Sequence, residues 1–275
     1  MTQSADQNPP APGPRRRKPP RRATVTSVST IAPRLVSVLV TGDELDGFTD
    51  AAPTSHLKLF LPPAGADRLL LPEQGPDGAQ VWNHDEALRP VIRTYTPRRY
   101  DPATKTLEIQ VVLHGVGPAS EWAERVKPGD EVAVGGPGGR FTLDGSVGRW
   151  WLAADESAIP AVGTLLDALP ETASAEVHVE VAGAEDEIDL PSAAKTSVVW
   201  HHRRDGSFGV ELDQAARDAE IAEGTRIWVA CEAAAMRGIR RYFTGERGLP
   251  VSQMVTRGYW RIGESNHPDH DYGED

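Results

Sequence analysis

The sequence predicts two domains in series: an antiparallel β-barrel, then an α/β domain built on a parallel sheet. In residues 24–139, short stretches of alternating apolar and polar residues are separated by turn residues, a pattern typical of an antiparallel barrel. From about residue 147, apolar strands alternate with segments of helical spacing, which indicates β-α-β units and a parallel sheet. The length of 275 residues accommodates two ordinary domains.

The first half contains the expected barrel strands. Alternation and β-branched residues predict strands over 24–30, 35–41, 56–61, 91–96, 107–114 and 131–134. The first two strands form a hairpin around Ala32-Pro33, and the Gly- and Pro-rich stretch 62–78 is a long loop. One short helix, over 120–126, interrupts this half.

The second half begins with an apolar strand, and Trp150-Trp151 in that strand is expected to pack at the domain junction. Strands are predicted over 150–154, 176–181, 197–201 and 227–230, and helices over 159–169 and 232–243. We therefore divide the chain into a disordered basic Pro-rich tail (1–22), a barrel domain (23–146), an α/β domain (147–264) and an acidic C-terminal tail (265–275) that frays.

Charge and composition exclude several classes of protein. The net charge is −11, although the first 22 residues carry six bases and one acid, so the body of the chain is strongly acidic. An acidic body argues against a general nucleic-acid binder. No apolar run is long enough for a membrane span or a secretory signal. The single Cys231 fits a reducing compartment. We expect a cytoplasmic monomer that binds neither nucleic acid nor membrane.

The stretch "RTYTPRRYD", residues 93–101, has the residue types of a ligand site. Strand alternation puts Arg93 and Tyr95 on one face. A tyrosine ring offers a stacking surface, and an arginine offers a fork that matches phosphate oxygens. Thr96, where the strand yields to Pro97, has a hydroxyl and an N–H free to meet the edge of a ligand. Taken alone the pattern is weak, because Tyr and Arg alternate on many exposed strands.

The stretch "HGVGPASEWAERVKPGD", residues 114–130, predicts an anion site. Gly115 and Gly117 free the backbone, and Pro118 starts a helix. The N–H groups of Ala119 and Ser120 are then unpaired at the helix N-terminus, which suits an anion. An ordinary capped helix after a glycine turn is the alternative reading of the same residues.

Four motifs in this order resemble the siderophore-interacting proteins, which are flavin-dependent ferric-siderophore reductases of the ferredoxin-NADP reductase superfamily. The motifs are "RTYTPRRYD", "HGVGPASEWA", "ADESAIPAV" and "GYWRIG", and the resemblance covers about residues 24–264. It implies that the first domain is a six-stranded Greek-key barrel that binds FAD and that the second is a nicotinamide-type α/β domain. It also implies reduction of a ferric siderophore, so that iron leaves as Fe(II), with NADH, NADPH or ferredoxin as the electron donor.

The resemblance also implies a set of site residues. Arg93 would meet the FAD phosphates, Tyr95 would stack on the isoalloxazine, and Thr96 would bond its edge. The remaining implied cofactor contacts are Asp101, His114, Gly117, Pro118, Ala119, Ser120, Asp155, Ser157, Ala158 and Trp260. Lys58, Arg140 and Arg261 would receive the anionic siderophore, and no protein metal site is implied.

Two departures from the family pattern leave alternatives open. Ser157 replaces the usual Thr and keeps the hydroxyl, whereas Cys231-Glu232 replaces the usual Gly-Glu and narrows the approach of a nicotinamide. Rival functions are a general flavin reductase or electron-transfer flavoprotein, and a non-catalytic siderophore or flavin carrier. Arg203 and Arg204 either meet a nicotinamide phosphate or lie in an exposed loop. His201-His202 is read as two strand residues on opposite faces rather than as a metal pair.

Overall fold

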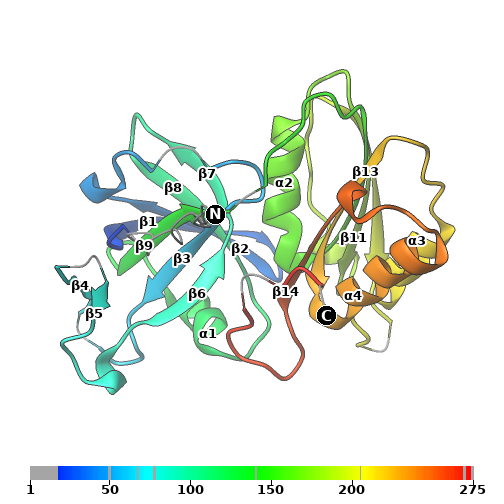
Figure 1. Cartoon of the computed structure of the whole chain (residues 1–275). Coiled ribbons are helices and arrows are strands. Elements are labelled where there is room, and N and C mark those ends of the chain that lie inside the picture. The colour runs from blue at the N-terminus through cyan, green and yellow to red at the C-terminus, as the bar shows by residue number, and fades with distance from the viewer. Residues whose placement is uncertain are drawn as a thin grey trace, which may run out of the picture.

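The chain folds as two lobes, one around each predicted sheet (Figure 1). The computed structural model describes residues 18–48, 51–66, 68–76, 79–139, 141–204, 206–268 and 271–273. Most of the basic tail, residues 1–17, lies outside this range. Among the described residues, no helix has the length and apolar character needed to cross a bilayer.

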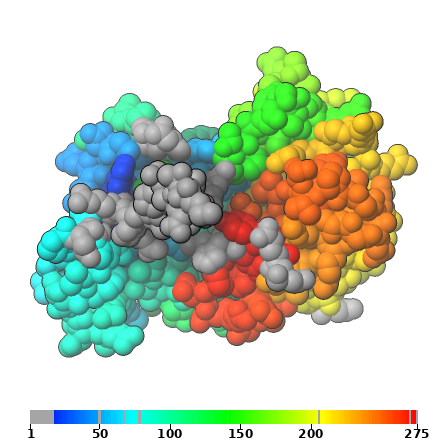
Figure 2. All heavy atoms as spheres, in the orientation of Figure 1, coloured from blue at the N-terminus to red at the C-terminus, as the bar shows by residue number. Residues whose placement is uncertain are grey.

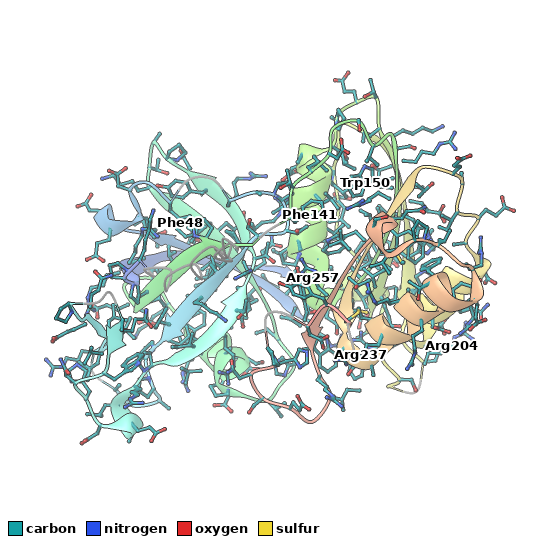
Figure 3. The ribbon with its side chains drawn as sticks, in the orientation of Figure 1. Phe48, Phe141, Trp150, Arg204, Arg237 and Arg257 are labelled. Carbon is teal, nitrogen blue, oxygen red and sulfur yellow. The ribbon has the colours of Figure 1, made fainter. Side chains whose placement is uncertain are left out.

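The N-terminal lobe contains one antiparallel sheet in the order β6-β3-β9-β1-β2-β8-β7. Its strands are β1 (Arg21–Ala32), β2 (Leu35–Thr41), β3 (His56–Leu61), β6 (Val91–Tyr95), β7 (Pro97–Asp101), β8 (Thr106–Val112) and β9 (Glu131–Gly138). The strands at the two ends of this order, β6 and β7, are separated in the chain by Thr96 alone. The sheet therefore curls until its edges meet, and it encloses an apolar core that includes Phe48 (Figure 3).

Two details of this lobe differ from the sequence-based expectations. The described sheet has seven strands rather than six, because Pro97 begins β7 instead of ending the strand region. Proline is tolerated there because β7 is an edge strand. Arg21 and Arg22 belong to β1 rather than to a disordered tail, and their guanidinium groups donate to the carbonyls of Gly136 and Leu69.

The C-terminal lobe contains a five-stranded parallel sheet in the order β12-β11-β10-β13-β14. The strands are β10 (Arg149–Asp155), β11 (Ser174–Val181), β12 (Lys195–His202), β13 (Thr225–Glu232) and β14 (Met254–Trp260). The described residues also include a two-stranded ribbon of β4 (Glu73–Gln74) and β5 (Gln80–Val81) in the loop of the first lobe. The predicted pairing of an antiparallel with a parallel sheet is confirmed.

Helices cover both faces of the parallel sheet. One face packs on α2 (Ile159–Ala168), and the other packs on α3 (Val210–Asp218) and α4 (Ala233–Arg241). A π-helical turn, η5 (Tyr242–Glu246), follows α4 directly, so that helical structure extends past the end of the helix predicted over 232–243. A fourth helix, α1 (Pro118–Arg125), packs against β6 and β8 of the barrel instead.

Contacts from several strands hold the two lobes together. Arg34 donates to Asp186 at 2.6 Å, and Arg98 donates to Asp167 on α2 at 2.5 Å. The Arg98 guanidinium lies against Gly163, where an added Cβ would come within 2.8 Å of it. These contacts place Arg98 in the domain interface.

The C-terminal segment returns to the α/β lobe instead of fraying. The carbonyl of Asp271 accepts from Gly258 N, and its carboxylate accepts from Arg237 at 2.6 Å and bonds His267 at 2.9 Å. On the face shown in Figure 2, the residues at the red end of the colour scale lie between the two lobes. Within the described part of the expected acidic tail, His267 and Asp271 are therefore packed on the α/β lobe.

Candidate cofactor-binding site

Arg93 and Tyr95 lie on the same face of β6, as predicted. Their partners across the pair are Leu59 and Leu57, which point into the barrel core. Among the described residues, the Arg93 guanidinium bonds only the carbonyl of Ile92, at 2.9 Å. Burial raises the pKa of Tyr95 to about 12, so its hydroxyl stays neutral. The result is a partly buried aromatic ring beside an arginine that has no carboxylate partner among the described residues.

The second part of the predicted site is the N-terminus of α1, the helix that packs against β6. Its N-cap, Gly117, has φ 87° and ψ 154°, and no described side chain caps the helix. A conformation of this kind is essentially restricted to glycine. Helix geometry leaves the N–H groups of Ala119 and Ser120 without intrahelical partners. The arrangement suits an anion.

Ser120 holds the loop in place rather than facing outward. Its hydroxyl is buried and accepts from the N–H groups of His114, at 3.1 Å, and Gly115, at 3.2 Å. The His114 ring is exposed and lies 3.8 Å from the position of a Cβ on Gly117. The predicted residues His114, Gly117, Ala119 and Ser120 therefore form one loop and helix start, with Pro118 at its first helical position.

Thr96 joins this site to the second lobe. Its side chain is buried and shares a hydrogen bond with the hydroxyl of Tyr259 on β14. Burial raises the pKa of Tyr259 to about 12. Sequence reasoning missed Tyr259, although it stands next to Trp260 in the motif "GYWRIG".

Asp155 connects the carboxyl ends of three parallel strands. Oδ1 accepts from the N–H and the hydroxyl of Ser157, and Oδ2 accepts from Glu232 N at 2.9 Å and Trp260 Nε1 at 2.7 Å. These four donors use the accepting capacity of the carboxylate. Asp155 and Ser157 are therefore hydrogen-bonded to each other, and the neighbouring Ala158 is fully buried. We interpret Asp155 as a residue that positions Trp260.

The surroundings of Asp155 penalise its charge. Burial, followed by the neighbouring charge of Glu156, raises the pKa of Asp155 to about 7, against the opposing effect of the hydrogen bonds. Burial also raises the pKa of Glu180 and that of Cys231. Cys231 is fully buried and lies at the end of β13. It is therefore a neutral, inaccessible thiol.

Three other predicted residues have their contacts elsewhere. Asp101 lies at the far end of β7, about 13 Å along the strand from Pro97, and its carboxylate accepts from Ala103 N and the Thr104 hydroxyl. Lys58 lies on the face of β3 opposite to Tyr95 and donates to the Thr94 hydroxyl at 2.8 Å. Arg261 is half-exposed and pairs with Glu264 at 3.2 Å. Arg140 lies outside the described residues.

Two pairs of adjacent residues have separate partners in the structure. Arg203 is bound to Glu156 through both terminal nitrogens, with a side chain only 8% exposed, whereas the side chain of Arg204 is 84% exposed. His201 bonds His178, and His202 bonds Glu187. The separate partners agree with the opposite orientation of adjacent strand residues.

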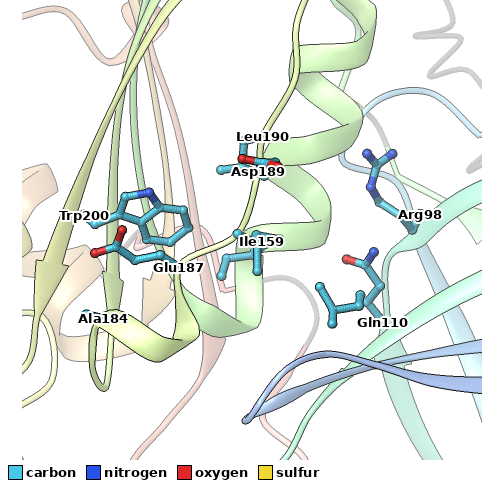
Figure 4. A pocket seen from close by; sticks show the side chains of 10 residues that line it. Arg98, Gln110, Ile159, Ala184, Glu187, Asp189, Leu190 and Trp200 are labelled. Atoms are coloured by element: carbon cyan, nitrogen blue, oxygen red, sulfur yellow. The ribbon is translucent and has the colours of Figure 1, made fainter.

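A cavity of about 760 Å³ lies between the lobes, beside α2. Figure 4 shows Arg98 and Gln110 of the barrel lobe on one side, with Ile159, Glu187 and Trp200 of the α/β lobe on the other. None of the predicted site residues lines this cavity. The cavity and the predicted cofactor site are therefore two separate regions of the molecule.

Comparison with known proteins identifies both lobes. The family model for the siderophore-interacting FAD-binding domain matches residues 24–141, and the model for siderophore-interacting protein matches residues 148–263. The chain is 30% identical to the NADPH-dependent ferric-chelate reductase of Escherichia coli, over 87% of this chain and 92% of that protein. It is 27% identical to the ferric vibriobactin reductase ViuB of Vibrio cholerae, over 92% and 93%.

A solved structure agrees with these relatives. The siderophore utilization protein from T. fusca superposes with a TM-score of 0.82 at 32% identity, over 91% of this chain and 96% of that chain. The two lobes and their order are therefore those of one family. The chain belongs to the siderophore-interacting protein family.

Proposed function

We propose that this chain is a flavin-dependent ferric-siderophore reductase, which passes electrons from NADH, NADPH or ferredoxin through FAD to Fe(III) and releases the iron as Fe(II). Two relatives that match nearly the whole chain are named as a ferric-chelate reductase and a ferric vibriobactin reductase. When bound, FAD accepts an electron pair and releases single electrons. Siderophore oxygens are hard ligands that hold Fe(III) better than Fe(II), so reduction loosens the metal.

The observation that carries the proposal is the pairing of Arg93 with the uncapped start of α1. An arginine fork without a carboxylate partner and two free N–H groups at a helix N-terminus both suit a diphosphate. The partly buried ring of Tyr95 is on the same face as Arg93 and suits an aromatic ring system. These residues fit the phosphates and the flat ring of FAD.

Each residue then has a separate task. Arg93 and the N–H groups of Ala119 and Ser120 bind the diphosphate, with the Ser120 hydroxyl holding the loop. Tyr95 stacks, and Thr96 orients the ring edge while Tyr259 fixes the Thr96 hydroxyl. Asp155 holds Trp260 in place at the junction of the lobes.

The substrate is an anionic iron complex, and we propose that basic residues receive it. Arg261 is the best supported, because it follows Trp260 directly and its side chain is 50% exposed. Lys58 and Arg140 complete the proposed set from the barrel side. We also propose that the protein works as a monomer in the cytoplasm. Its one cysteine is buried and unpaired, which favours a reducing compartment.

The test is an anaerobic mixing experiment on purified protein. We expect a yellow protein that, with NADH, NADPH or reduced ferredoxin, delivers Fe(II) from a ferric siderophore to a ferrous-specific chelator. A colourless protein that FAD does not reconstitute would contradict the proposal. Flavin reduction without Fe(II) would indicate a general flavin reductase, and ferric-siderophore binding without turnover would indicate a carrier.

The docking residues have a matched control. Arg261→Ala should weaken ferric-siderophore binding while the bound flavin stays in place. Arg149→Ala, at the exposed amino end of β10, makes the same change at the opposite edge of the sheet and should leave binding unaltered. Equal affinities in the two variants would place the docking surface elsewhere.

A further inference from the structure

The carboxyl edge of the parallel sheet contains a place where nucleotides bind in open α/β folds. From β10 the chain proceeds to β11 and β12 on one side, and β13 and β14 lie on the other side. The strand order therefore reverses between β10 and β13, and ligands bind in the crevice outside the strand ends at such a point. The residues at these strand ends decide whether that crevice is open.

Five side chains contact one another at these strand ends, and we call them the clasp: Asp155, Glu156, Arg203, Phe208 and Trp260. Asp155 accepts from Trp260 Nε1 at 2.7 Å, and the Trp260 ring meets Phe208 at 4.7 Å between centroids with an interplanar angle of 85°. The Arg203 guanidinium lies 4.6 Å from the centroid of Phe208. Arg203 then returns to Glu156, the neighbour of Asp155, through both terminal nitrogens.

The clasp links three strand ends that are far apart in sequence. Asp155 ends β10, Arg203 follows β12, and Trp260 ends β14. A branch ties it to β11, because Arg203 lies 3.6 Å from the fully buried Glu180. Glu180 also accepts from Gly209 N at 2.8 Å, next to Phe208. The segment that carries Phe208 is therefore fixed at both Arg203 and Gly209.

The two ends of the clasp use the groups that would recognise a dinucleotide. A guanidinium fork is a suitable partner for a phosphate, but here the carboxylate of Glu156 fills the fork of Arg203. An indole face is a suitable partner for a planar ring, but here Phe208 lies against Trp260. The side chains of Arg203 and Glu156 are only 8% and 18% exposed, so a ligand must break the pair to reach either one.

We propose that the clasp is an internal occupant of the crevice that a nicotinamide dinucleotide must displace, so that Phe208 and Glu156 determine which electron donor the chain accepts. This inference rests on the proposed function. A donor whose binding requires a minor, open state has its apparent affinity reduced by the fraction of that state. Removing an occupant should therefore tighten nucleotide binding instead of weakening it.

The test measures binding, not turnover. NADP⁺ and NAD⁺ are titrated by calorimetry into the FAD-loaded protein and into Phe208→Ala. We expect NADP⁺ to bind Phe208→Ala about tenfold more tightly than the unaltered chain. Phe141→Ala is the matched control, because Phe141 also meets a tryptophan edge-on, Trp150 at 6.4 Å, away from the crevice. Unchanged or weaker binding by Phe208→Ala would overturn the proposal.

Glu156→Gln tests the Arg203 end of the clasp independently of the Phe208 end. Freeing the fork of Arg203 should raise the preference for NADP⁺ over NAD⁺ about fivefold, because only NADP⁺ carries the extra phosphate. An unchanged ratio would overturn the role of Glu156. Phe208→Leu keeps most of the packing and should give a smaller tightening in the same direction. Iron release after reduction by dithionite, which needs no crevice, tests the proposed function separately.

Discussion

The two edges that face each other across the lobes differ in how their polar groups are satisfied. On the barrel side, Arg93 bonds only a neighbouring carbonyl among the described residues, and α1 begins without a side-chain cap. On the α/β side, Asp155 accepts four hydrogen bonds and Arg203 fills its fork with a carboxylate. We call the barrel edge the incomplete edge, because its polar groups lack side-chain partners among the described residues. We call the α/β edge the complete edge, because its polar groups are paired.

This difference separates the effects of mutations at the two edges. Buried polar groups are normally paired, so the incomplete edge is the one that a ligand completes. Substitutions there should reduce ligand binding and have little effect on the unliganded fold. At the complete edge, a substitution leaves partners unpaired inside the protein, so it should reduce stability first.

The largest expected effect is from Arg203→Ala. It leaves Glu156 without its partner and Glu180 without its nearby charge, and breaking a buried pair typically costs about 3–5 kcal/mol. Denaturant unfolding should show this loss in the free energy of unfolding. Arg204→Ala, next in sequence and largely exposed, should change the same quantity by less than about 0.5 kcal/mol. Equal losses would show that the complete edge does not depend on its buried pairing.

The next largest effect is the dependence of stability on pH. The pKa of Asp155 is raised from 3.8 to about 7, and that of Glu180 is raised as well. Because the folded state binds these protons more tightly than the unfolded state does, their contribution to the free energy of unfolding is fully present below about pH 4. That contribution is lost as the pH rises to about 7. The change is on the order of a few kcal/mol. Asp155→Asn, which does not titrate, should flatten this slope; an unaltered slope would assign it to other groups.

Arg93→Ala tests the incomplete edge. A hydrogen bond to a charged group contributes about 1.5–3 kcal/mol, so FAD dissociation should increase by about 10- to 100-fold. The free energy of unfolding of the FAD-free chain should stay nearly constant. Arg99→Ala, on the adjacent strand with an exposed side chain, should change neither quantity. A loss of stability without FAD would show that Arg93 is structural.

The sequence alone was sufficient to predict the positions of residues that depend on the local sequence pattern. Alternation placed Arg93 and Tyr95 on one face, and the glycine and proline positions predicted the start of α1. The contact of Asp101 with the cofactor stays a prediction, since Asp101 is close to Tyr95 in sequence while β7 carries it away from Tyr95 along the strand. The partners of the clasp could not be predicted, since Glu156 and Arg203 are 47 residues apart and only the parallel sheet brings them together.

The smallest expected effect concerns Tyr259, which connects the two edges through Thr96. Tyr259→Phe removes its hydrogen bond with Thr96, and a typical hydrogen bond contributes about 0.5–1.5 kcal/mol. Tyr100→Phe is matched to it, because the Tyr100 hydroxyl donates to the Leu45 carbonyl within the barrel at 2.7 Å. Both should lower stability similarly, but only Tyr259→Phe should also weaken FAD binding, by about threefold, because Thr96 is then no longer held in place. If FAD binds both variants equally well, the orientation of Thr96 does not depend on the second lobe, and the barrel forms its site alone.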